Sequence, residues 1–232
     1  MIRKSVCPSL MVLSVFFVAL CSTGCRRHKT VNLESGAAVR VINAVSGSED
    51  LTLSVNDRDA WRGSRFRSTS GYKATEPGNY SLSMATSAAQ AGAASNVSVT
   101  LERGAVYTVL AIDPRHDGDP VRTMIWREDR EQVPSDRARV LFVHAGPDLG
   151  PLEFLVNNIV AGEGTRFAHK SEPMLLNPGT YAFKAINAGS DDVRPVVGPT
   201  SFRLEGGRSY TVIAMGRRST NTVSLEAYSD NL

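Results

Sequence analysis

Hydrophobic residues recur along this chain in short runs that turn residues interrupt. Several runs alternate hydrophobic and polar residues with a period of two, and none keeps a helical period, which predicts β-strands. The predicted strands are residues 39–44, 51–55, 80–84, 97–101 and 107–112 in the first half, and residues 140–145, 152–156, 181–186, 200–204, 210–215 and 223–228 in the second. The pattern therefore predicts an all-β protein.

The two halves of the chain are copies of one another. Residues 39–84 align without a gap with residues 140–185, and 13 of the 46 pairs are identical. A second block, residues 101–111, aligns with residues 204–214 with seven of eleven identical. Self-similarity over so long a period indicates tandem domains. We therefore expect a first repeat over residues 38–128, an exposed linker over residues 129–137 and a second repeat over residues 138–232.

Each copy has the strand number and spacing of an immunoglobulin-like Greek-key β-sandwich. The shared motif Leu-x-x-Gly-x-x-Tyr-x-Val contains Tyr107 and Tyr210 and resembles a tyrosine corner, in which the hydroxyl bonds to the backbone across a turn. Pro-Gly turns precede the strands that contain Tyr80 and Tyr181. Because both copies share these four tyrosines, we expect them to be structural, and we expect each copy to close its own apolar interior.

The first 24 residues resemble a signal peptide. Arg3 and Lys4 precede an apolar stretch that is too short to span a membrane and that ends in small residues. The following Ser22-Thr23-Gly24-Cys25 resembles the lipobox of bacterial lipoproteins, which implies that Cys25 is acylated and that residues 25–37 are a tether. Arg26 after this cysteine resembles the outer-membrane class of Gram-negative lipoproteins. Ordinary secretory cleavage nearby is the alternative.

Cysteine content and charge narrow the possible partners. Cys7 and Cys21 lie in the leader, so the mature chain keeps Cys25 alone and has no internal disulfide. The formal charge is +3, and loss of Arg3 and Lys4 with an acid-free leader lowers it to +1. That balance does not indicate a nucleic-acid-binding protein. We expect the lipid anchor to hold the protein at the membrane, facing the periplasm or the cell surface.

The opening Val-Arg-Val-Ile-Asn-Ala, the Pro-Gly-x-Tyr turn and Leu-x-x-Gly-x-x-Tyr-Thr-Val together resemble DUF4397, a family of surface domains of unknown function that often occur in tandem in exported proteins. The resemblance covers both repeats. The same order of elements also resembles, more loosely, the periplasmic adaptor of alginate O-acetylation, a protein of two sandwiches without catalytic residues. That resemblance implies an alternative role as an accessory adaptor in exopolysaccharide O-acetylation.

The motifs of common enzymes are absent from the sequence. There is no Gly-x-Ser-x-Gly, phosphate loop, His-Glu-x-x-His or Cys-x-x-Cys. His144 aligns with Asn43, which favours a hydrogen-bonding role at a strand end. The acidic segment 113–120 offers oxygen ligands at Asp117 and Asp119, but a solvated turn explains it without an ion. We expect no enzyme activity, no cofactor and no metal; a metal hydrolase using this segment with His116 is the enzymatic alternative.

The strongest candidate for a contact surface is the loop of residues 58–73, where arginine and aromatic residues interleave. Guanidinium groups pair with carboxylates or phosphates, and aromatic faces stack on sugars or cations. Arg58, Trp61, Arg62 and Arg67 have no like residue in the second copy. The candidate ligand-binding residues are Arg58, Trp61, Arg62, Arg67, Tyr72 and Lys73.

We therefore expect a non-catalytic envelope protein that presents this loop to an acidic glycan or a protein partner. The alternative is an exposed arginine loop in which Trp61 covers the sandwich edge.

Overall fold

The computed structural model describes residues 33–48, 50–86 and 95–230. Over these ranges the chain forms strands and turns, and no helix long and apolar enough to cross a membrane is found there. The predicted signal peptide, Cys25 and most of the predicted tether lie outside the described residues. The all-β prediction is confirmed.

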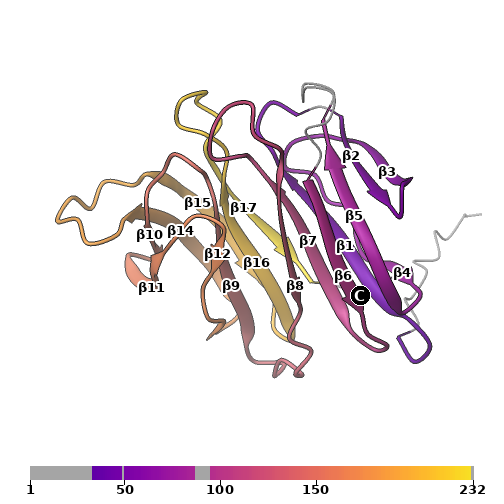
Figure 1. Ribbon diagram of the computed structural model, residues 1–232. Helices are drawn as coiled ribbons and strands as arrows, with labels where there is room; N and C mark the ends of the chain where they lie inside the picture. The colour runs from indigo at the N-terminus through magenta and orange to yellow at the C-terminus, as the bar shows by residue number, and fades with distance from the viewer. Residues whose placement is uncertain (1–32, 49, 87–94, 231–232) are drawn as a thin grey trace, which may run out of the picture.

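The first repeat folds into two facing sheets of four strands each (Figure 1). One sheet has the order β4-β1-β7-β8 and the other has the order β3-β2-β5-β6. The strands are β1 (Ala37–Ala44), β2 (Leu51–Val55), β3 (Arg58–Ser64), β4 (Lys73–Thr75), β5 (Gly78–Ala85), β6 (Ser95–Leu101), β7 (Val106–Ile112) and β8 (Arg122–Arg127).

The second repeat forms the same pair of sheets. One sheet has the order β12-β9-β16-β17, with β13 also paired to β9, and the other has the order β11-β10-β14-β15. The strands are β9 (Ala138–Ala145), β10 (Leu152–Val156), β11 (Ile159–Thr165), β12 (His169–Lys170), β13 (Met174–Leu176), β14 (Gly179–Asn187), β15 (Val197–Leu204), β16 (Arg208–Met215) and β17 (Ser224–Ser229).

The segment 58–73, expected to be one loop, contains β3 and ends at the first residue of β4. The reason lies in the hairpin that precedes it, where Asn56 and Asp57 adopt positive φ angles of 48° and 63°. Two such residues form the tight turn whose twist suits a β-hairpin, so β3 pairs back onto β2. Asn157 and Asn158, at 47° and 68°, make the equivalent turn before β11.

The connectivity does not confirm the immunoglobulin-like Greek key. In that fold the first two strands share a sheet. Here β1 and β2 lie in opposite sheets, and β1 pairs in parallel with β7, as β9 does with β16. Each repeat is therefore a β-sandwich whose first strand pairs in parallel with its next-to-last strand.

Each sandwich has an apolar interior between its two sheets. In the first, Val41, Leu53 and Leu82 belong to one buried cluster, and in the second, Phe142, Phe154 and Phe183 belong to another.

The four tyrosines hold strand ends to neighbouring turns. The hydroxyls of Tyr107 and Tyr210 accept hydrogen bonds from backbone N–H groups at 3.2 and 2.8 Å. Those of Tyr80 and Tyr181 donate to carbonyl oxygens at 2.8 and 3.0 Å.

A third buried cluster joins the two sandwiches and was not expected from the sequence. The sheet that contains β1, β7 and β8 packs against the sheet that contains β9, β16 and β17, and we call this contact the junction (Figure 1). Residues at equivalent positions of the two copies meet there. They include the pairs Ile42 and Val143, Ala44 and Ala145, Leu110 and Ile213, Ile112 and Met215, and Phe66 and Phe167.

Candidate functional site

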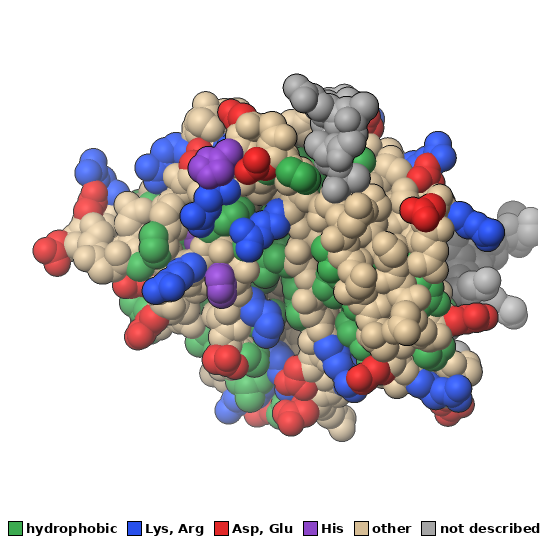
Figure 2. Space-filling view, viewed as in Figure 1, with side chains coloured by type: hydrophobic (Ala, Val, Ile, Leu, Met, Phe, Trp, Pro, Cys, Tyr) green, Lys and Arg blue, Asp and Glu red, His purple; other side chains and the backbone are tan. Residues whose placement is uncertain are grey.

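The six candidate ligand-binding residues do not form one surface. They lie in three places: the exposed strand β3, the junction, and a cavity inside the first sandwich. Acidic and basic side chains are interspersed over the face of the molecule shown in Figure 2. The next paragraphs follow the candidate residues to these three places.

Arg67 and Tyr72 belong to the junction. The Arg67 guanidinium donates to the carbonyl oxygen of Thr222 at 3.4 Å, and its Nε lies 3.5 Å from Oε1 of Glu226. Tyr72 lies beneath Arg40, whose Cζ is 5.0 Å from the centre of the tyrosine ring. Burial raises the pKa of Tyr72, although Arg40 opposes that shift. Tyr72 is thus packed beneath Arg40, whereas Arg67 contacts the second sandwich and keeps an exposed side chain, so the two residues lie apart from the other candidates.

Arg58 and Arg62 lie on β3, an edge strand, and both are exposed. Arg62 pairs with Asp59 on the same strand, and Asp59 in turn accepts a hydrogen bond of 2.5 Å from the hydroxyl of Ser54. Within the described residues Arg58 has no ion pair. Both guanidinium groups are exposed to solvent and can contact a ligand. The exposed ion pair between Arg62 and Asp59 contributes little to stability, so a ligand can replace Asp59 at low cost.

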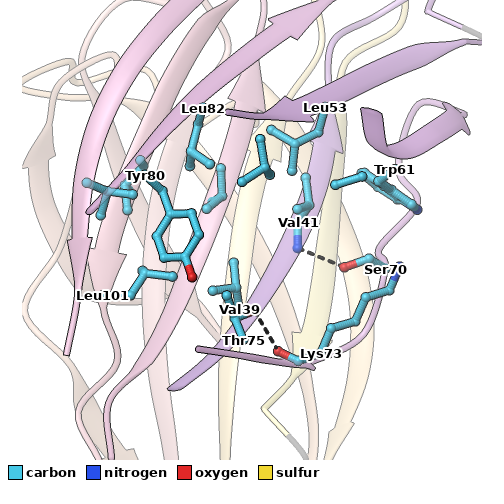
Figure 3. Close-up of a pocket in the computed structure, with 15 residues that line it drawn as sticks. Val39, Val41, Leu53, Trp61, Ser70, Lys73, Thr75, Tyr80, Leu82 and Leu101 are labelled. Carbon is cyan, nitrogen blue, oxygen red and sulfur yellow. Dashed lines mark hydrogen bonds between the residues drawn. The ribbon is translucent and has the colours of Figure 1, made fainter. Parts of the chain in front are cut away.

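Trp61 and Lys73 line an apolar cavity of about 100 Å³ between the two sheets of the first sandwich. Their side chains and that of Ser70 lie along one side of the cavity, opposite Tyr80 and Leu101 (Figure 3). Trp61 lies on the edge strand β3, Lys73 begins the edge strand β4 and Ser70 lies in the segment between them. We call these three residues the mouth of the cavity. The rest of the lining is mostly aliphatic and includes Val39, Val41, Leu53, Val55, Leu82, Val99, Leu101, Val109 and Ile125.

The second sandwich fills the corresponding space with phenylalanine rings. Four aliphatic residues around the first cavity are replaced in the second copy. The replacements, read from the alignment of the repeats, are Val41 by Phe142, Leu53 by Phe154, Leu82 by Phe183 and Val99 by Phe202. Phe142 stacks on Phe154 with ring centres 4.9 Å apart, and Phe183 lies 5.6 Å from Phe202. The same scaffold is thus packed in one copy and hollow in the other.

The residues at the mouth of the cavity also differ between the two copies. Trp61 and Lys73 are replaced by Gly162 and Met174. A Cβ atom at Gly162 would lie 3.5 Å from both Phe142 and Phe154, in ordinary van der Waals contact with the residues that fill this core. Trp61 thus lines the hollow interior of the first copy, and Gly162 lies against the filled interior of the second.

The acidic segment 113–120 contacts the second sandwich. Asp113 is buried and accepts hydrogen bonds from the backbone N–H of Ser46 at 3.2 and 3.1 Å. Burial raises its pKa, while Ser46 and Arg217 oppose the shift. Arg217 also lies 3.5 Å from Asp117. Within the described ranges no three His, Cys, Asp or Glu side chains lie close enough to hold a metal ion together.

His144 has the structural role that its alignment with Asn43 suggested. Its Nδ1 accepts from the N–H of Gly146 at 3.2 Å, and its Nε2 lies 2.5 Å from the carbonyl oxygen of Gly150, to which it donates. Burial lowers the pKa of His144, which favours the neutral ring that these two bonds require. Asn43 likewise accepts from the N–H of Val45 at 2.9 Å.

A family model described as a domain of unknown function, DUF4397, matches residues 37–154 and again residues 138–232. The chain belongs to the DUF4397 family. It carries two copies of the domain, as the sequence predicted, and no catalytic family is indicated. A search of curated proteins found no match.

The sequence singled out Trp61 and Lys73 but not the cavity beneath them. The signal was present in the alignment of the repeats, where four aliphatic residues of the first DUF4397 copy face phenylalanines in the second. Because each replacement is apolar for apolar, the hydrophobic pattern does not change, and only the sum of side-chain volumes reveals the difference.

Proposed function

We propose that this protein is a non-catalytic lipoprotein of the cell envelope that binds an anionic ligand at the edge of its first sandwich. Cys25 carries the anchor, and the protein resides at the outer membrane, facing the periplasm or the cell surface. The ligand site is the β3–β4 edge, by which we mean β3, β4 and the mouth of the cavity between them.

The observation that carries this proposal is the difference between the copies at this edge. Arg58, Trp61 and Arg62 stand where the second copy has Ile159, Gly162 and Glu163, and Lys73 stands where it has Met174. The first copy therefore presents cationic and aromatic groups at this edge, whereas the second copy forms the same sandwich without them. Such groups recognise anionic ligands through charge-assisted hydrogen bonds and stacking.

The test is retention of the full mature chain on an immobilised acidic polysaccharide, the ligand class that the sequence favoured. We expect Arg58→Ala and Arg62→Ala, combined in one variant, to weaken retention while thermal unfolding stays nearly unchanged, because both side chains are exposed. Adding Trp61→Ala should weaken retention further and also lower stability, because Trp61 packs against the first core. The matched control carries Ile159→Ala and Glu163→Ala on the equivalent strand β11. Equal retention of the wild type and the β3 variant would remove the proposal.

A further inference from the structure

The cavity of the first sandwich is suited to an aliphatic chain. Its lining is mostly aliphatic. Apolar cavities stay dry and accept apolar guests. An apolar cavity of about 150 Å³ holds a benzene molecule. The present cavity, of about 100 Å³, therefore has room for one short stretch of a single chain and not for two chains.

The mouth of the cavity places a cation where the chain would emerge. Lys73 is exposed, and among the described residues no carboxylate pairs with it. An ammonium group beside an apolar opening suits a ligand that has an aliphatic tail and an anionic head. The second copy lacks both features together, because Met174 replaces Lys73 and phenylalanine rings occupy the interior.

We propose that the first sandwich binds a single-chain aliphatic carboxylate, with its tail in the cavity and its carboxylate at Lys73. This inference rests on the proposed function, since the carboxylate group would be held at the same β3–β4 edge that is proposed to take an anionic ligand. Trp61 covers the tail from the side of β3, at the position where the second copy has Gly162.

The experiment is calorimetric titration of the full exported chain with linear carboxylates of four to twelve carbons. The protein carries Cys25→Ser, so that neither an acyl anchor nor a detergent competes for the cavity. We expect one site, with an affinity that rises about fourfold for each added methylene until the cavity is full and then stops rising. No saturable binding by any chain length would overturn the inference.

Two variants locate the binding. Val41→Phe with Leu53→Phe introduces the stacked rings that the second sandwich already accommodates, and we expect it to abolish binding. Lys73→Met introduces the residue of the second copy and should lower carboxylate affinity by up to about fivefold, while the affinity for the alcohol of equal length is unchanged. Lys170→Met, at an exposed lysine of β12, is the charge-matched control and should have no effect.

The outcomes separate this inference from the proposed function. If the variant Val41→Phe with Leu53→Phe binds the carboxylate as well as the wild type does, the ligand lies elsewhere and the inference is overturned. If that variant does not fold, the wild-type titrations test the inference: an affinity that does not rise with chain length and then level off would overturn it. Retention on acidic polysaccharide that depends on β3, without carboxylate binding, would overturn the inference alone. Loss of both would overturn the proposed function as well.

Discussion

Arg40 of the first sandwich donates a hydrogen bond to Thr211 of the second, with 3.0 Å between Nη2 and Oγ1. The same guanidinium donates from Nε to Thr108 at 2.6 Å, and Thr108 is the residue that aligns with Thr211 in the repeat. It also pairs with Glu128 and Asp230. One buried arginine, 2% exposed, thus links equivalent strands of the two copies, β7 and β16.

We predict that Arg40→Leu, which introduces the residue of the equivalent position Leu141, lowers the free energy of unfolding by about 3–5 kcal/mol. The cost arises because Glu128 and Asp230 would remain buried without their cation. Urea denaturation measures the change. Adding Glu128→Gln and Asp230→Asn should restore part of the loss.

The control for this prediction is Arg62→Leu at an exposed arginine, which should change the free energy of unfolding by no more than about 0.5 kcal/mol. If Arg40→Leu were as mild as Arg62→Leu, the junction would not depend on the buried arginine.

The pH dependence of stability follows from Asp230. Burial raises the pKa of this carboxyl to about 7, although Arg40 opposes the shift and Glu128 reinforces it. A carboxyl whose pKa is higher in the folded state takes up a proton on folding, so the free energy of unfolding falls as the pH rises from about 4 to about 7. The contribution is at most about 1.4 kcal/mol for each pH unit.

Urea denaturation of the wild type and of Asp230→Asn at several pH values isolates this contribution. We expect the advantage of the wild type over the variant to shrink as the pH rises across that window. A difference between the two proteins that stays constant would mean that Asp230 does not titrate in this range.

The tyrosine hydroxyls predict a graded loss of stability in both copies. Tyr107→Phe and Tyr210→Phe remove the acceptors of the Glu102 and Glu205 N–H groups and should cost about 0.5–1.5 kcal/mol. The alanine variants also lose the ring and should cost about 3–5 kcal/mol. Thermal unfolding of the four variants orders these costs. An alanine variant as stable as its phenylalanine counterpart would show that the ring contributes nothing.

Local sequence signals predicted the strands and turns well where a residue acts on its neighbours. Asn56 and Asn157 are shared because a tight hairpin turn requires positive φ, and Tyr107 and Tyr210 are shared because each hydroxyl reaches a turn five residues away. β3 was missed because its charged residues and Gly63 do not alternate with apolar ones, and its pairing comes from the hairpin instead.

The junction and the cavity depend on contacts between distant residues. The run 109–112 is apolar at consecutive positions, which signals burial on both faces but does not identify the partner. Arg67 and Tyr72 were assigned to a ligand because exposed arginine and aromatic residues are common in binding surfaces. In the folded protein Arg67 lies 3.5 Å from Glu226 of the second sandwich and Tyr72 packs beneath Arg40, contacts that the local sequence did not reveal. The lipid anchor, the envelope location and the adaptor alternative stay predictions.

The central claim is that one sandwich is hollow and the other is filled, and xenon binding tests it most directly. Xenon enters dry apolar cavities without requiring a particular ligand. In a crystal of the full chain under xenon pressure we predict a xenon atom among Val41, Leu53 and Leu82, and none between the rings of Phe142 and Phe154. An empty first sandwich, or equal occupancy of both, would contradict the account.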